Sequence, residues 1–302
     1  MILISLVGEQ PLPILLPALH LKPGNHILVH TRLTQPVAKR LRSVLGKTKC
    51  HMLEADQHDI EGIAFEINSL IQRIRSEQGS QDIRQEIVLN PTGAKKPMAF
   101  GMLAQALRGE DRFVYLESEK RTSKLYTYQV SGGRFRMEDA IELGELLTLD
   151  IYLKSFVPDY KTRKVKPGNI NPFETAVEEV LKASEFEYLP RVSPAGVSGK
   201  LEIDFVVRVG NQVGILELKS GKNSPKEGLD QLAMAGGRAY LGIYTAKFLV
   251  VTQQLAEKLQ ELESLAEARH IHTIVIPDYI PGQPLSDESR RLLLDTLGKN
   301  LS

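Results

Sequence analysis

Short apolar runs alternate with amphipathic stretches along the first half of the chain. The apolar runs predict buried strands at Met1–Val7, Ile27–Thr31, Glu86–Asn90 and Phe113–Glu117. The spacing of apolar residues between them predicts helices at 35–45, 59–75 and 97–107. A hairpin is expected farther on, with strands at 125–130 and 134–137. Strands that alternate with helices indicate an α/β fold with a doubly wound parallel sheet.

The composition changes at residues 148–169, which include the segment VPDYKTRKVKPGN. Many charges together with Pro and Gly are typical of a linker, so we expect one domain at 1–147 and a second at 170–302. The second domain is predicted to begin with a helix at Pro172, followed by a hairpin and a helix that carries Gln231. A strand at 248–252, a helix at 255–269, a strand at 273–277 and a last helix from Asp287 complete a compact α/β unit.

The predicted hairpin lies in the segment LEIDFVVRVGNQVGILELKSGK. Gly210-Asn211 is a favoured two-residue turn between strands, because such turns need positive φ. With this turn, paired positions sum to 421, so that Asp204 faces Glu217 and Glu202 faces Lys219. Paired residues share one face of a sheet, and that face repeats every second residue. All four charged side chains are therefore expected on the same side.

Opposed carboxylates on neighbouring strands repel each other, which costs stability. A divalent cation between Asp204 and Glu217 would remove the repulsion, and carboxylate oxygens are the ligands that Mg²⁺ and Mn²⁺ prefer. Lys219, two residues beyond Glu217, would hold a water or a phosphoryl oxygen beside the cation, as in a metal-dependent phosphodiesterase. A solvated strand face with a Glu–Lys pair explains the alternation equally well. The pattern alone leaves both interpretations open.

The order D-x₁₂-E-x-K, read from Asp204 through Glu217 to Lys219, resembles that of the PD-(D/E)xK nuclease superfamily, which has a restriction-endonuclease-like α/β fold. The upstream segment NPFETAVEEVLKAS is similar to the first core helix of that superfamily and contains Glu174. Asn171 is suited to cap this helix. The downstream segment LDQLAMAGGRAYLG supplies Gln231. The resemblance implies that Asp204 and Glu217 bind the metal, that Lys219 is catalytic, and that Glu174 and Gln231 assist.

Three loops of the first domain follow predicted strands, at 8–11, 31–34 and 90–98. Ligands of open parallel sheets bind beyond the carboxyl ends of the strands. The third loop, NPTGAKKPM, combines Gly, Thr and Lys before a helix, as a phosphate-bearing or nucleotide-like ligand requires. It lacks the pattern of a P-loop, and no GxGxxG fingerprint follows a strand. A plain connection between strand and helix remains equally compatible with the local chemistry.

The segments SLVGEQPLPILLPALHLKPG, HTRLTQPVAKRL and LNPTGAKKPM together resemble the CARF domain of CRISPR-associated ancillary proteins. In that family the third segment commonly reads N-x-T-G-G-T-K-x-M, from which this chain departs only at Ala94 and Lys95. The implied fold is a Rossmann-like CARF domain followed by the restriction-endonuclease-like domain that is fused to it in the same family. The implied ligand-binding residues are Gly8, Glu9, Gln10, Thr31, Thr34, Asn90, Thr92, Gly93, Ala94, Lys95, Lys96 and Met98.

The combined resemblance implies a homodimer that binds one cyclic oligoadenylate, namely cyclic tetra-adenylate. Binding of this ring would activate a Mg²⁺- or Mn²⁺-dependent nuclease that cleaves DNA and/or RNA in type III CRISPR antiviral defence. Two alternatives stay open. In the first, the protein is a ligand-controlled regulator that binds nucleic acid without cutting it. In the second, the first domain degrades the ring through Thr31, Thr34 and Lys95.

Composition and charge narrow the class of protein only slightly. The chain has 302 residues, a length typical of two domains, and a formal net charge of +1 at pH 7, so no global basic field indicates nucleic acid. The single cysteine, Cys50, excludes an intrachain disulfide and a cysteine-based zinc site. The apolar start MILISLV lacks a basic leader, and no membrane span is apparent, so we expect a cytoplasmic protein with no membrane partner.

Overall fold

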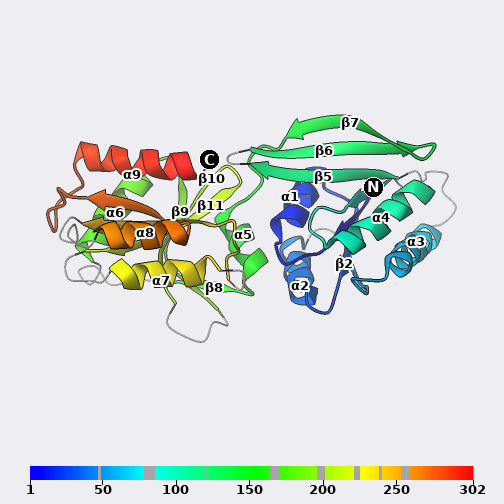
Figure 1. Ribbon diagram of the computed structural model, residues 1–302, viewed down its shortest axis with the longest axis horizontal. Coiled ribbons are helices and arrows are strands. Elements are labelled where there is room, and N and C mark those ends of the chain that lie inside the picture. The colour runs from blue at the N-terminus through cyan, green and yellow to red at the C-terminus, as the bar shows by residue number, and fades with distance from the viewer. Residues whose placement is uncertain are drawn as a thin grey trace. The chain divides into compact units, whose positions relative to one another are not determined.

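The computed structural model describes residues 1–46, 49–77, 86–109, 111–119, 122–163, 171–195, 201–220, 225–237, 240–252 and 259–301. It contains two compact units, Met1–Leu146 and Leu147–Ser302 (Figure 1). Each unit is built on its own β-sheet. No helix in these ranges is long and apolar enough to cross a membrane.

The first unit has one sheet of order β3-β2-β1-β4-β5-β6-β7. Its strands are β1 (Ile2–Leu6), β2 (Asn25–His30), β3 (Lys49–Glu54), β4 (Ile87–Asn90), β5 (Arg112–Glu119), β6 (Thr122–Ser131) and β7 (Arg134–Glu142). Its helices are α1 (Leu12–Leu21), α2 (Gln35–Val44), α3 (Ile60–Glu77) and α4 (Lys96–Gly109). The strands from β3 to β5 are parallel, and β6 and β7 extend the sheet as an antiparallel hairpin.

Helices cover both faces of this sheet. Residues of α3 and α4, such as Ile67 and Met102, form one core with Ile4 of β1 and Ile27 of β2. Helices α1 and α2 contact β1, β2 and β3, on which the alternate side chains point away from that core. The order 3-2-1-4-5 is that of a doubly wound sheet with its topological switch point between β1 and β4, where ligands of such folds bind.

The second unit has a sheet of order β13-β12-β11-β10-β9-β8, in which β8 to β11 are antiparallel and β11 to β13 parallel. Its strands are β8 (Tyr160–Thr162), β9 (Glu187–Pro194), β10 (Ile203–Val209), β11 (Gln212–Lys219), β12 (Ala246–Thr252) and β13 (His272–Ile276). Its helices are α5 (Leu149–Phe156), α6 (Pro172–Lys182), α7 (Pro225–Ala235), α8 (Leu259–Ala268) and α9 (Asp287–Asn300). Residues 255–258, the start of one predicted helix, lie outside the described ranges.

The segment 148–169, predicted as a linker, contains helix α5 and strand β8 of the second unit. The side chain of Thr148 caps α5 by accepting a hydrogen bond from the N–H of Ile151. Leu149, Tyr152 and Phe156 bury one stripe of this helix. The charges that suggested a linker lie mainly in and after β8, an edge strand, and residues 164–170 lie outside the described ranges.

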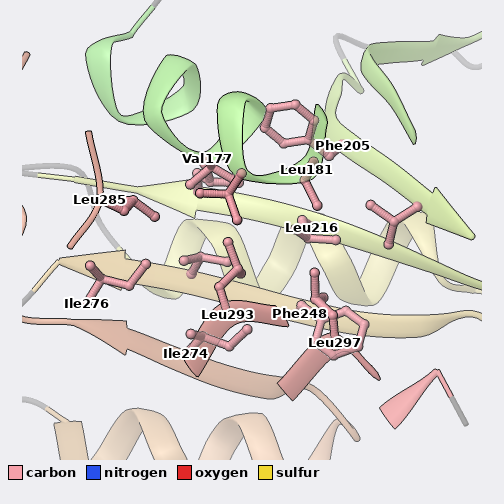
Figure 2. Close-up of a cluster of buried hydrophobic side chains, with 14 of the residues drawn as sticks. Val177, Leu181, Phe205, Leu216, Phe248, Ile274, Ile276, Leu285, Leu293 and Leu297 are labelled. Atoms are coloured by element: carbon pink, nitrogen blue, oxygen red, sulfur yellow. The ribbon is translucent and has the colours of Figure 1, made fainter. Parts of the chain in front are cut away.

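The core of the second unit lies between α6, α9 and one face of the sheet (Figure 2). In Figure 2, Val177 and Leu181 of α6 point toward Phe205 and Leu216 of the β10–β11 hairpin. This packing fixes the hairpin, because its apolar side chains can face the core in only one register. The opposite face of β10 and β11 therefore carries the residues of the candidate site.

We expect Leu216→Ala to destabilise the second unit by about 2–5 kcal/mol, because Leu216 is fully buried at the centre of this core. Leu292→Ala, on an exposed position of α9, should change stability by no more than about 0.5 kcal/mol. Urea unfolding of both variants tests the difference. Equal losses would contradict the assignment of Leu216 to the core.

Candidate functional site

The β10–β11 hairpin has the predicted register. Val209 pairs with Gln212, and the pairing continues to Phe205 and Leu216 with the same sum of residue numbers. Gly210 takes the positive φ of the turn, 57°. Asn211 does not share it, and its side-chain oxygen instead accepts a hydrogen bond from the N–H of Leu147 at 3.3 Å. The turn was thus predicted correctly, although only Gly210 supplies the positive φ.

This register brings Asp204 and Glu217 to opposed positions at the end of the hairpin away from the turn. One oxygen of Asp204, Oδ2, accepts a hydrogen bond from the N–H of Leu218 at 2.7 Å. Glu217 is buried, with 4% of its surface exposed. The carboxylates are therefore held next to each other and largely out of water.

Burial, together with the charge of neighbouring carboxylates, raises the pKa values of both carboxyl groups. Desolvation is the main cause for Asp204, whose pKa rises to about 7, and the charge of Glu174 adds to it. Desolvation followed by the charge of Asp204 raises the pKa of Glu217 to about 8. Without a cation, the pair therefore retains a proton at neutral pH.

Lys219 lies beside Glu217 on the same face of β11. Its Nζ donates to Oε1 of Glu217 at 2.8 Å and to Oε1 of Gln231 at 2.9 Å. Helix α7 comes this close because residue 228 is glycine, where an added Cβ would lie 3.2 Å from Cε of Lys219 and 2.7 Å from Cδ1 of Leu249. The structure thus brings Gln231, predicted from the downstream helix, into contact with the lysine.

Glu202, expected to face Lys219, has a different partner, so that expectation was wrong. Its carboxylate forms an ion pair with Arg163 at 3.0 Å. Glu202 precedes the first residue of β10, so strand alternation no longer directs its side chain. Lys219 is instead fixed by Glu217 and Gln231.

Glu174 lies in the first turn of α6, which begins as predicted. The side chain of Asn171 accepts a hydrogen bond from the N–H of Phe173 at 3.0 Å, and Pro172 occupies the first turn. Burial raises the pKa of Glu174, while the neighbouring Arg191 lowers it. Nη1 of Arg191 lies 3.6 Å from Oε2 of Glu174. No sequence pattern pointed to Arg191, because strand β9 was not predicted.

The donor set fits a hard divalent cation. Among the described residues, no group of three or more His, Cys, Asp or Glu side chains is arranged to hold a metal ion. The site instead offers the opposed carboxylates of Asp204 and Glu217. Each engages one oxygen with a described donor, Leu218 N–H or Lys219 Nζ, so that the second oxygen of each would be available to a cation. Carboxylate oxygens at this spacing of strands match the chemistry of Mg²⁺ and Mn²⁺.

In the first unit, the loops after β1 and β4 meet at the switch point of the sheet. A Cβ on Gly8 would lie 1.8 Å from the carbonyl oxygen of Gly93, so the two backbones approach as only glycine allows. A Cβ on Gly93 would lie 2.8 Å from Cδ1 of Ile14 and 3.0 Å from the carbonyl oxygen of Leu6. The predicted loops at 8–11 and 90–98 therefore form one surface.

Side-chain hydrogen bonds of Asn90 and Thr92 hold these loops together. Asn90 is fully buried and donates to the carbonyl oxygen of Pro13 at 2.8 Å. Its Oδ1 accepts hydrogen bonds from the N–H and the hydroxyl of Thr92 at 3.2 and 2.8 Å. The Thr92 hydroxyl in turn accepts from the N–H of Leu116 at 3.0 Å. Asn90 and Thr92, predicted as ligand-binding residues, therefore use their polar side chains to fix the conformation of the loop.

Thr31 and Thr34 form a reciprocal pair at the start of α2. The N–H of each donates to the hydroxyl oxygen of the other, at 3.0 and 3.3 Å. Beside them lies a pocket of about 570 Å³ lined by Thr31, Arg32, Leu33, Glu54, Ala55, Asp56 and Gln57. Lys95 of the loop 90–98 donates to Gln57 at 2.6 Å, which connects this loop to the pocket. Glu54, Asp56 and Gln57 were not predicted to line a ligand site, because strand β3, which ends at Glu54, was not predicted.

The remaining predicted ligand residues differ in exposure. Glu9, Lys95 and Lys96 are exposed, and Ala94 closes a turn with its N–H on the carbonyl oxygen of Pro91. The side-chain amide of Gln10 is buried and has no hydrogen-bond partner among the described residues. Met98 is only 2% exposed and packs in the core with α3 and the sheet.

Comparison with known proteins gives a match in structure. No protein-family model and no curated protein matches the sequence. The chain is similar in structure to Can2 from Sulfobacillus thermosulfidooxidans, solved in complex with cyclic tetra-adenylate. The match covers 100% of this chain and 99% of Can2, with a TM-score of 0.70 and 14% sequence identity. The chain has the two-domain fold of Can2.

Two further solved structures show the same architecture. Protein VC1899 from Vibrio cholerae matches over 100% of this chain and 98% of its own, with a TM-score of 0.68 and 12% identity. A type III CRISPR defence DNA nuclease activated by cyclic oligoadenylate matches over 84% of this chain and 45% of its own, with a TM-score of 0.53 and 14% identity. At these identities the likeness establishes the fold. The predicted α/β fold, a Rossmann-like domain with a doubly wound sheet followed by a second α/β domain, is confirmed.

We expect the stability of the metal-free protein to fall as the pH rises from about 5 to about 8.5. Asp204 and Glu217 have raised pKa values in the folded state, so the folded protein binds protons that the unfolded chain, with carboxyl pKa values near 4, has released. The contribution of these two carboxyl groups to the free energy of unfolding is therefore absent below pH 4 and most unfavourable above pH 8. It amounts to about 1.4 kcal/mol for each tenfold difference in proton affinity between the folded and unfolded states. Urea unfolding across this range measures it.

Asp204→Asn is the matched variant, because it removes the opposed charge while keeping the shape of the side chain. Its free energy of unfolding should depend less on pH than that of the wild-type protein. Parallel pH profiles for the two proteins would contradict the shared proton.

Proposed function

We propose that this protein is a metal-dependent nuclease that a cyclic oligoadenylate activates, in type III CRISPR antiviral defence. The observation that carries the proposal is the buried, opposed pair Asp204 and Glu217 with Lys219 beside it, in a unit of restriction-endonuclease-like fold. Buried like charges destabilise a protein, so a fold that keeps them together calls for a function that uses them. The Can2 fold supports the same proposal, because Can2 was solved with cyclic tetra-adenylate.

A divalent cation at this site would be held by Asp204 and Glu217 and would supply Lewis-acid stabilisation of the phosphodiester together with an activated water. Lys219 is placed for two tasks. Its ammonium group, fixed by Glu217 and Gln231, orients the attacking water and stabilises negative charge that develops on the phosphoryl oxygens. Gln231 holds the lysine in this position, and Glu174 adds a carboxylate at the edge of the site.

The activator would bind at the switch point of the first unit. The loops that follow β1 and β4 present backbone groups around Gly8 and Gly93, and Lys95 and Lys96 add positive charge for phosphates. We propose cyclic tetra-adenylate as the activator and a homodimer as the form that binds it. Activation requires that the ring bind the active arrangement of the dimer more tightly than the resting one.

We expect Glu217→Gln and Lys219→Met to lower ring-activated cleavage at least about 100-fold, because each removes a group that acts on the transition state. The assay follows single- and double-stranded DNA and RNA with Mg²⁺ or Mn²⁺, and titrates cyclic tri-, tetra- and hexa-adenylate. Glu267→Gln and Lys182→Met, on exposed positions of helices α8 and α6, are the matched controls and should keep full activity.

Full activity in Glu217→Gln or Lys219→Met would exclude these residues from catalysis. Ring-dependent binding of nucleic acid by the wild-type protein, with no cleavage of any substrate, would instead identify a regulator without nuclease activity.

We expect Gly8→Ala to weaken binding of cyclic tetra-adenylate at least about tenfold. The added methyl group would collide with the carbonyl oxygen of Gly93 and displace the loop that we propose binds phosphate. Calorimetric titration measures the affinity. Gly24→Ala is the control, because its Cβ would lie at an ordinary 3.8 Å from the carbonyl oxygen of Met1. Unchanged affinity in Gly8→Ala would place the ring elsewhere.

A further inference from the structure

Arg191, on strand β9, has a backbone conformation that its side chain disfavours. Its φ is 51°, in the left-handed region, where a residue with a Cβ is strained by about 1 kcal/mol. Such strain persists only where surrounding contacts hold it, and it is concentrated at functional sites.

Strand pairing places Arg191 next to the candidate metal site. Val192 pairs with Ile203 and Pro190 with Phe205, so Arg191 falls opposite Asp204. In a regular strand, its side chain would share the face of Asp204. The left-handed backbone breaks this alternation, and the guanidinium meets α6, the helix that covers the other face, where it contacts Glu174 and Glu178.

Contacts on several sides fix this buried cation, which is 7% exposed. Both terminal nitrogens of Arg191 lie 3.4 Å from Oε2 of Glu178, and Nη1 lies 3.6 Å from Oε2 of Glu174. Its Nε donates to the carbonyl oxygen of Arg163 at 3.3 Å, and its own carbonyl oxygen accepts from the N–H of Arg163 at 3.0 Å. Arg191 thereby joins strand β9 to the residue that follows edge strand β8 and to the first turns of α6.

We propose that Arg191 is a positioning residue that holds the carboxylate of Glu174 at the edge of the site formed by Asp204 and Glu217, where its negative charge favours binding of a divalent cation. The inference rests on the metal site of the proposed function. Glu178 holds the guanidinium from the next turn of α6, which leaves Glu174 as the carboxylate nearer the site. Strand pairing sets Arg191 opposite Asp204, and its guanidinium contacts Glu174, so Glu174 lies at the same end of the hairpin as Asp204.

A purely structural ion pair would also join α6 to β9, and a double-mutant cycle separates the two roles. Arg191→Gly removes the guanidinium while glycine keeps the left-handed backbone without strain. Glu174→Gln removes the charge that Arg191 is proposed to position. The four proteins, wild type, the two single variants and the double variant, are compared as full-length chains by calorimetric titration with Mn²⁺ and by the Mn²⁺ concentration that gives half-maximal cleavage.

We expect Arg191→Gly to weaken Mn²⁺ binding about tenfold in the wild-type background and to leave it unchanged in the Glu174→Gln background, because Arg191 acts through Glu174. Equal losses in both backgrounds would overturn the proposal and leave Arg191 a structural residue. Glu178→Gln is a second test that leaves the backbone of Arg191 untouched, and it should weaken Mn²⁺ binding in the same direction, again only when Glu174 is present.

The outcome also separates this inference from the proposed nuclease. Non-additive Mn²⁺ binding without cleavage of any nucleic acid would support the role of Arg191 and reject the nuclease. Metal-dependent cleavage with additive losses would support the nuclease and reject the role of Arg191.

Discussion

Repulsion between the carboxylates of Asp204 and Glu217 is the constraint around which the second unit is arranged. The hairpin register sets them opposite each other, and the core formed by Phe205, Leu216 and α6 prevents that register from slipping. The surrounding structure reduces the unfavourable energy without removing it. The N–H of Leu218 and the ammonium of Lys219 each satisfy one oxygen, and burial raises the pKa values of both carboxyl groups, which favours a bound proton. A divalent cation bound between these two carboxylates would displace that proton.

The first unit satisfies a different constraint, the close approach of backbones at the switch point of its sheet. Gly8 and Gly93 permit the approach, and the buried side chain of Asn90 makes it stable by bonding to Thr92 and Pro13. The motif residues of this loop thus divide into those that build it and those that reach solvent. Asn90, Thr92 and Met98 build it, whereas the lysines are exposed.

Elements with a strong local signal were predicted well. The hairpin register followed from Gly210 and from strand alternation, and the start of α6 followed from Asn171 and Pro172. Elements with mixed signals were missed. Helix α1 contains Pro17 in its interior, β3 and β9 are strands with many polar residues, and α5 adjoins a charged segment that resembles a linker. In each of these, tertiary packing decides the structure against the local preference of the chain.

The sequence by itself determined the alternation of strands and helices, the face that Asp204, Glu217 and Lys219 share, and the loop that joins β4 to α4. These features depend on periodicity and on turn residues, which act over a few positions. Only the tertiary structure decided that Gln231 and not Glu202 contacts Lys219, that Glu54 to Gln57 line a pocket beside Thr31, and that Arg191 turns toward Glu174. These contacts join residues distant in the chain, and their geometry depends on helix packing and backbone strain that no local pattern encodes.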